Sequence, residues 1–63
     1  MAEIVIGNER LTVRENESIE RTMLSSGKYP DAFLYLLNGR PVPMTMIPED
    51  DSVIEAVRVA SGG

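Results

Sequence analysis

The chain has 63 residues, of which ten are acidic and six basic, for a formal net charge of −4, and it contains neither cysteine nor histidine. Its length limits it to one small domain. Without cysteine or histidine it has no disulfide, no thiol or imidazole nucleophile, and none of the usual zinc ligands. We therefore expect it not to be an enzyme, and to bind no metal or cofactor of its own.

The acidic balance also argues against nucleic acid and membrane as partners, because phosphate groups are bound by clustered lysine and arginine side chains. The six basic residues are scattered along the chain. No apolar run is as long as a signal peptide core or a membrane span. These features predict a soluble, cytoplasmic, monomeric protein that binds other proteins.

The first half of the sequence predicts a β-hairpin followed by a short helix. Segments 3–6 and 10–14 alternate apolar and polar residues, and the turn-forming residues between them are typical of an antiparallel hairpin. Asn16 or Ser18 is the expected N-cap of the helix, and Gly27 is expected to end it. The residues expected to face the core are Ile4, Ile6, Leu11, Val13, Ile19 and Met23.

The second half predicts three more strands. Segment 33–37 is the most strand-like run, and Asn38-Gly39 after it is a strong hairpin signal. Segment 40–42 can form only a brief edge strand, because its prolines cannot donate to a ladder. Residues 44–51 form an irregular loop, and 52–60 alternate as a long last strand. The order predicts an α+β roll, in which a mixed sheet of four to five strands is crossed by one short helix.

Two stretches resemble a known family. Segments 37–43 (LNGRPVP) and 57–63 (VRVASGG), taken with the element order, are similar to the ubiquitin-like β-grasp sulfur carriers. That group includes the thiamine-biosynthesis carrier, the small subunit of molybdopterin synthase and the small archaeal modifier proteins. The resemblance implies a single β-grasp domain over residues 1–60, followed by a flexible tail, 61–63, that ends in a diglycine motif.

The resemblance also implies an activity. A ubiquitin-activating-type enzyme would use ATP to adenylate the carboxylate of Gly63. A sulfur donor would then convert the adenylate to a thiocarboxylate, which supplies sulfur for the biosynthesis of thiamine or molybdopterin or for the thiolation of tRNA. Alternatively, an amine of a target protein would attack the adenylate and form an isopeptide bond. Only Gly62 and Gly63 carry over as motif residues. The helix and connections are shorter than in some relatives, which leaves the pathway open.

A partner surface is predicted on segment 33–37. If its odd-numbered residues face the helix, Leu34 and Leu36 point outward and form an exposed apolar strip, a feature that often marks a binding site. A register error of one residue would exchange the two faces, and a dimer or loop covering the strip is the other alternative. The residues of the last strand expected to flank the strip are Ala56, Arg58 and Ala60.

Several charged and sulfur-containing side chains have two interpretations each. Arg58 either pairs with an acidic groove of the activating enzyme or is an ordinary strand charge. Lys28, the only lysine, is an acceptor for self-conjugation together with the N-terminal amine, or else a solvated residue after the helix, which we favour. Segment 49–51 is expected to be a solvated acidic turn, since adjacent carboxylates lack the spacing of a calcium loop. Met44 and Met46 are expected to fill the end of the core.

Two functions compete with that of a carrier. One is a non-covalent β-grasp binding module that uses Leu34 and Leu36 to hold a larger enzyme. The other is a small regulatory subunit of an enzyme complex. Deletion of Gly62 and Gly63 distinguishes the binding module from the carrier, because the module would remain active without them.

Overall fold

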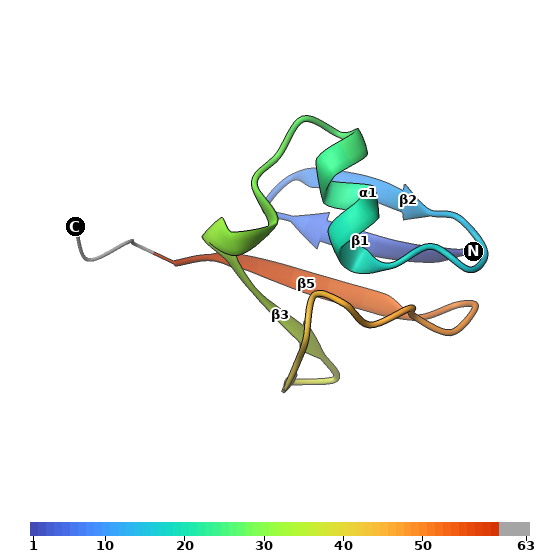
Figure 1. Ribbon diagram of the computed structural model, residues 1–63. Helices are drawn as coiled ribbons and strands as arrows, with labels where there is room; N and C mark the ends of the chain where they lie inside the picture. The colour runs from blue at the N-terminus through green and yellow to red at the C-terminus, as the bar shows by residue number, and fades with distance from the viewer. Residues whose placement is uncertain (60–63) are drawn as a thin grey trace.

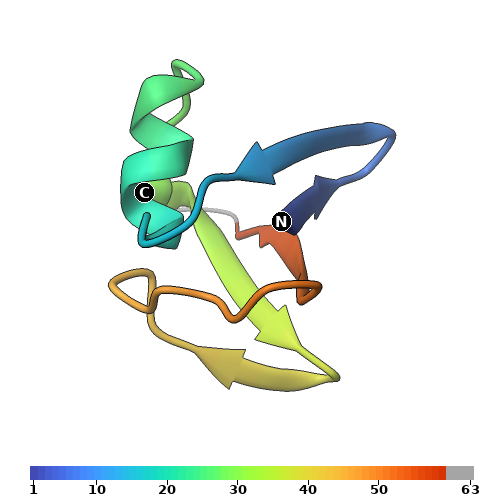
Figure 2. The ribbon, with the colours of Figure 1, turned by 90° about the vertical axis from the view of Figure 1, so that its right-hand side faces the viewer.

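The computed structural model describes residues 1–59, which form a five-stranded sheet and one helix. The strand order is β2-β1-β5-β3-β4, with β1 parallel to β5 and all other neighbours antiparallel. The helix α1 packs across one face of the sheet (Figures 1 and 2). This is the predicted β-grasp roll. The elements are β1 (Ala2–Ile6), β2 (Glu9–Val13), α1 (Ile19–Ser25), the 3-10 turn η1 (Pro30–Ala32), β3 (Phe33–Leu37), β4 (Arg40–Val42) and β5 (Val53–Arg58).

Both predicted hairpins are confirmed, with strand ends shifted by one or two residues at most. The β3–β4 turn places Asn38 at φ 53° and Gly39 at φ 82°. Two consecutive positive φ angles are what a type I′ hairpin turn requires, and asparagine and glycine tolerate them best. The turn therefore fixes β4 as the edge strand beside β3, where Pro41 costs no interior ladder bond.

The helix begins at Ile19, and its N-cap is Ser18, one of the two N-caps that the sequence allowed. The Ser18 Oγ accepts a hydrogen bond from the Arg21 backbone N–H at 3.1 Å. Asn16 lies in the preceding loop with φ 65°. Gly27, at φ 78°, follows the last turn as predicted. A seven-residue helix is too short to be stable alone, so its ends and its buried face must hold it.

The loop between β4 and β5 supplies further support for the helix. Two loop carbonyls accept hydrogen bonds from the first turn, that of Met46 from the Ile19 N–H at 3.0 Å and that of Met44 from the Glu20 N–H at 2.8 Å. These donors have no partner within a helix. Met44 and Met46 also pack against the core, as predicted. The irregular loop thus closes the open end of the space between sheet and helix.

The core lies between α1 and the sheet. Ile4 of β1 and Ile54 of β5 are directly paired and have no exposed surface, and Ile19 and Met23 of α1 are equally buried. Because side chains alternate across a strand, this pairing fixes which face of each strand is buried. The buried residues that form this core are Ala2, Ile4, Val13, Ile19, Met23, Tyr35, Ile54 and Ala56.

Tyr35 links the core to η1, and its burial leads us to expect that the free energy of unfolding falls at high pH. Its hydroxyl donates to the Pro30 carbonyl at 2.7 Å, and burial, with smaller contributions from Asp31 and Glu20, raises the pKa of Tyr35 from 10 to about 12. A pKa raised by folding means that the stabilisation is complete below pH 10 and is lost as the pH rises through 12. We expect Tyr35→Phe to lower the free energy of unfolding by about 1 kcal/mol at neutral pH and to remove this pH dependence.

Urea unfolding between pH 7 and 12 measures the effect. Tyr29→Phe is the matched control, since the Tyr29 side chain is 79% exposed and its removal should leave the pH profile unchanged. That variant also leaves Tyr35 as the only tyrosine, so its tyrosinate absorbance reports the Tyr35 pKa directly. A titration midpoint near 10 would contradict the burial of the Tyr35 side chain.

Candidate functional site

β5 is the element that leads toward the predicted reactive residues. It is the central strand, with β1 on one side and β3 on the other. One residue past its end, the Val59 N–H donates to the Ala32 carbonyl at 3.0 Å, so η1 holds the chain there. Ala60 and the predicted tail 61–63, with its two glycines, lie outside the described residues. The chain is thus held by β1 as far as Glu55, and by β3 and η1 on the other side as far as Val59.

Lys28 lies beside the end of β5 and differs from the expectation of a solvated residue. Its Nζ forms an ion pair with Glu9 Oε1 at 3.0 Å, and its side chain is only 25% exposed. The pair ties the turn after α1 to β2. Before it acts as a self-conjugation acceptor, the Lys28 amine must leave Glu9 and lose a proton. A shallow pocket of about 200 Å³ adjoins it, lined by Gly27, Lys28, Tyr29, Ala32, Phe33 and Arg58.

The prediction that Ala56 and Arg58 flank Leu34 and Leu36 was wrong. The assignment of β3 itself holds, since Tyr35 is buried and Leu34 is 43% exposed. The β3–β5 register, however, places Tyr35 opposite Ala56, which is 5% exposed. Directly paired residues share a face, so Ala56 and Arg58 belong to the helix side of the sheet. Arg58 accordingly pairs with Phe33 and lines the shallow pocket instead of flanking the leucines.

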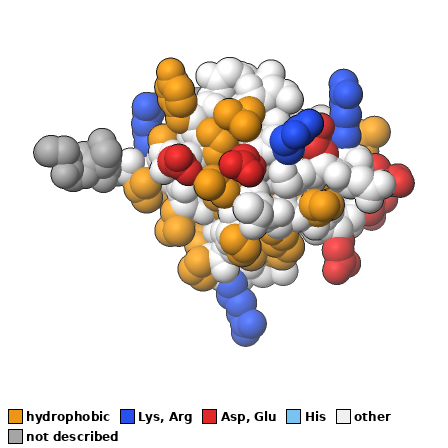
Figure 3. Space-filling view, viewed as in Figure 1, with side chains coloured by type: hydrophobic (Ala, Val, Ile, Leu, Met, Phe, Trp, Pro, Cys, Tyr) orange, Lys and Arg blue, Asp and Glu red, His pale blue; other side chains and the backbone are white. Residues whose placement is uncertain are grey.

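The side of the sheet away from α1, here called the outer face, carries a different set of residues. Val57 lies opposite Leu34, and Glu55 lies opposite Leu36. Val53 and Val57 are 50% and 40% exposed. Figure 3, like Figure 1, views the molecule from the side of α1, so the outer face lies on the far side of that picture. One row of the outer face crosses all five strands and consists of Arg10, Val5, Glu55, Leu36 and Pro41.

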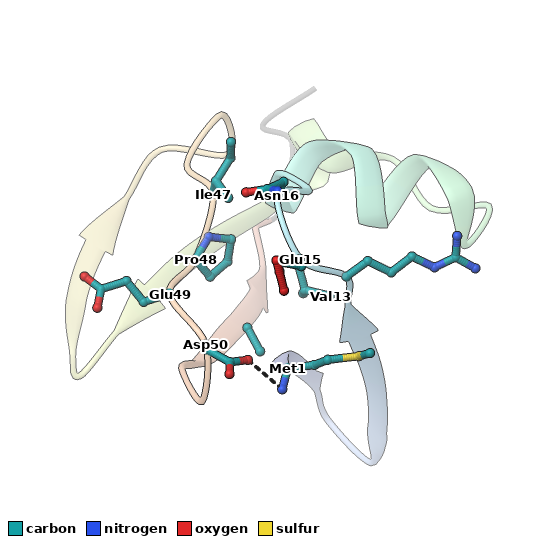
Figure 4. Close-up of a pocket in the computed structure, with 10 residues that line it drawn as sticks. Met1, Val13, Glu15, Asn16, Ile47, Pro48, Glu49 and Asp50 are labelled. Carbon is teal, nitrogen blue, oxygen red and sulfur yellow. Dashed lines mark ion pairs between the residues drawn. The ribbon is translucent and has the colours of Figure 1, made fainter.

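A second cavity, of about 250 Å³, lies at the end of the sheet where β1 and β5 begin. There the N-terminal nitrogen contacts Asp50 Oδ1 at 2.7 Å (Figure 4). This hydrogen bond raises the pKa of the ammonium group and lowers the pKa of Asp50. Glu49 points away from the cavity in the same view. Its lining residues are Met1, Ala2, Val13, Arg14, Glu15, Asn16, Ile47, Pro48, Glu49 and Asp50.

This cavity offers one exposed ion pair rather than a pair of neighbouring carboxylates able to divide acid and base roles. Over residues 1–59, no three acidic side chains lie close enough together to hold a metal ion. Within the same residues, no helix has the length and apolar character needed to cross a membrane. The features with evident binding chemistry are thus the outer face and the end of β5.

No family model, curated protein or solved structure matches this chain. A function must therefore be inferred from the chain's own residues. The three relevant features are the β-grasp sheet, the exposed aliphatic residues of the outer face, and the two glycines that follow the central strand in the sequence.

Proposed function

We propose that this chain is a ubiquitin-like sulfur carrier or protein modifier whose Gly63 carboxylate is adenylated by a separate ATP-dependent enzyme. The observation that carries the proposal is the position of Gly62 and Gly63 in the sequence, shortly after the central strand of a β-grasp sheet. Gly63 is five residues beyond Arg58, and an extended segment of that length reaches at most about 17 Å. A rigid domain with such a reach suits delivery of a carboxylate into another protein's cleft.

The chemistry requires the partner because a free carboxylate is a poor electrophile. One Gly63 oxygen attacks the α-phosphorus of ATP, and pyrophosphate leaves, giving an acyl-adenylate. Sulfide then attacks the acyl carbon and AMP leaves, giving a thiocarboxylate; a lysine amine attacking instead gives an isopeptide. The glycines suit a narrow channel because they lack Cβ atoms. As part of the proposal, the chain acts as a cytoplasmic monomer with no bound cofactor.

Intact-mass measurement tests the activation step. We expect the chain, mixed with its adenylating enzyme, ATP and sulfide, to gain the mass difference of one sulfur for one oxygen. Without ATP the mass should stay unchanged, because the carboxylate is then never activated. Failure of every ubiquitin-activating-type enzyme of the source organism to produce adenylate or thiocarboxylate would contradict the proposal.

A modifier can be told from a carrier by the remnant it leaves on other proteins. Trypsin cleaves after arginine, and Arg58 is the last arginine in the chain. A conjugated lysine would therefore carry the five-residue remnant Val-Ala-Ser-Gly-Gly after digestion. A search for the shorter Gly-Gly remnant would miss every such conjugate. A pure sulfur carrier would leave no remnant at all.

The outer face favours one alternative, a non-covalent binding module. Leu34 and Val57 are paired and both about two-fifths exposed, so they offer a partner an apolar surface without any chemistry at Gly63. In that case a chain without Gly62 and Gly63 would keep its full biological activity. For a carrier, the same deletion removes activity and leaves only binding.

A further inference from the structure

Glu55 occupies the centre of the aliphatic part of the outer face. Strand pairing places it between Val5 of β1 and Leu36 of β3. Along its own strand, Val53 and Val57 precede and follow it on the same face, because side chains alternate. A carboxylate is thus bordered by aliphatic residues in all four directions of the sheet.

Within residues 1–59, no side chain or terminus of the domain forms an ion pair with this carboxylate. Among residues 1–59, Glu55 takes part in none of the ion pairs or side-chain hydrogen bonds. In the part of the chain that the structure describes, Arg10 is the only cation that strand pairing places on the outer face, and its Nη1 is already bound to Glu3 Oε1 at 2.8 Å. It also lies two strands from Glu55, a separation of about 10 Å. In the free domain Glu55 is exposed, so water solvates its carboxylate.

A partner that covers this face must deal with that charge. Burying an unpaired carboxylate beneath aliphatic side chains is costly, whereas burying it against a cation recovers much of the cost. Glu55 therefore selects against plain apolar surfaces and in favour of a surface with one basic side chain among aliphatic ones.

A second copy of this chain does not meet the requirement. Its only outer-face cation, Arg10, is bound to Glu3. The face also measures about 24 Å across five strands and about 17 Å along them, or roughly 400 Å². Stable interfaces bury about 800 Å² on each partner. A face of that size is small for a stable dimer of this chain. An enzyme that acts on Gly63 also contacts residues beyond Val59 and so has further area to bury.

We propose that the outer face docks on the adenylating enzyme, at an aliphatic surface that carries one arginine or lysine, and that this cation pairs with Glu55. This inference rests on the proposed function. It adds Glu55 as the residue that determines which adenylating enzyme binds the chain.

Steady-state ATP–pyrophosphate exchange with the adenylating enzyme tests the pairing. We expect Glu55→Gln to raise the KM for the chain about tenfold or more, and Glu55→Arg about thirtyfold or more, with kcat unchanged. Glu55→Leu should also raise KM, although it makes the face more apolar. The KM of the unmodified chain should rise with salt, and that of Glu55→Gln should rise less, because screening acts on the lost pair.

Glu15→Gln and Glu15→Arg are the matched controls. Glu15 is an exposed carboxylate of the loop before α1, and these variants should leave KM unchanged. Equal urea midpoints for all variants establish that folding is unaffected. A second pair, Leu34→Ser and Val57→Ser, should raise KM if the face docks at all.

The outcomes separate the two proposals. If exchange occurs, but Glu55→Gln leaves the KM unchanged and Glu55→Leu lowers it, the proposed cation on the enzyme is wrong and the carrier function still stands. Exchange that is indifferent to the serine variants overturns docking through this face. Absence of exchange with any adenylating enzyme overturns the proposed function, and this inference with it.

Discussion

A chain that lacks only Gly63 is expected to lose adenylation at least a hundredfold in kcat/KM. The deletion leaves the carboxylate on Gly62, one residue and thus about 3.5 Å short of the α-phosphorus. A misplacement of about 1 Å in a reacting complex can already cost a hundredfold. The sheet and its outer face are untouched, so the shortened chain should still bind and inhibit the full-length one competitively. ATP–pyrophosphate exchange measures both effects.

Ser61→Ala is the control for this deletion. It changes a neighbouring side chain but keeps the chain length, so exchange should stay within a few-fold of the original rate. Full activity of the shortened chain would show that the carboxylate of Gly63 is not the reacting group. The non-covalent binding module would then be the better explanation of the fold and its outer face.

The elements were predictable because their signals are local. Asn38-Gly39 fixes a two-residue turn by its own backbone preferences, and the alternation in β1 and β2 identifies their buried sides without reference to the rest of the chain. Ser18 competed with Asn16 as N-cap, and position in the sequence could not decide between them. In the structure Ser18 has the extended backbone of an N-cap and accepts from the Arg21 N–H, whereas Asn16 has a positive φ of 65°.

The register of β5 was not predictable, and the error in the partner surface follows from it. Both sides of this strand carry apolar residues, Ile54 and Ala56 on one and Val53 and Val57 on the other. Hydrophobic alternation therefore does not say which side is buried. Ile54 decides the matter by meeting Ile4 in the core, a contact between residues fifty positions apart in the sequence. The significance of Glu55 depends on that contact and was missed with it.

Distance along the chain also concealed the environment of Lys28. Glu9 lies in β2 and Lys28 follows α1, and only the packing of helix on sheet brings their side chains to 3.0 Å. Gly62 and Gly63, by contrast, were identified by residue type and position alone. The candidate site thus combines one local signal with an exposed outer face that only the sheet assembles.

Replacing Ile54 with alanine should remove about 2 to 5 kcal/mol from the free energy of unfolding. The side chain has no exposed surface and is paired with Ile4 and Leu37 in the two neighbouring strands, so its loss leaves a cavity that the sheet cannot close. Small domains have stabilities near the lower end of about 5 to 15 kcal/mol. Much of the protein should then unfold at modest urea concentration, as measured by circular dichroism.

Val53→Ala is the matched control, because the adjacent residue points to the outer face and is 50% exposed. It should cost less than about 1 kcal/mol, the range of strand propensities. A larger effect of Val53→Ala than of Ile54→Ala would show that the two faces of β5 have been exchanged. A larger loss of stability in Ile54→Ala than in Val53→Ala would show that the side of β5 facing α1 stabilises the domain. The other side, with Glu55 at its centre, is then free to vary with the partner.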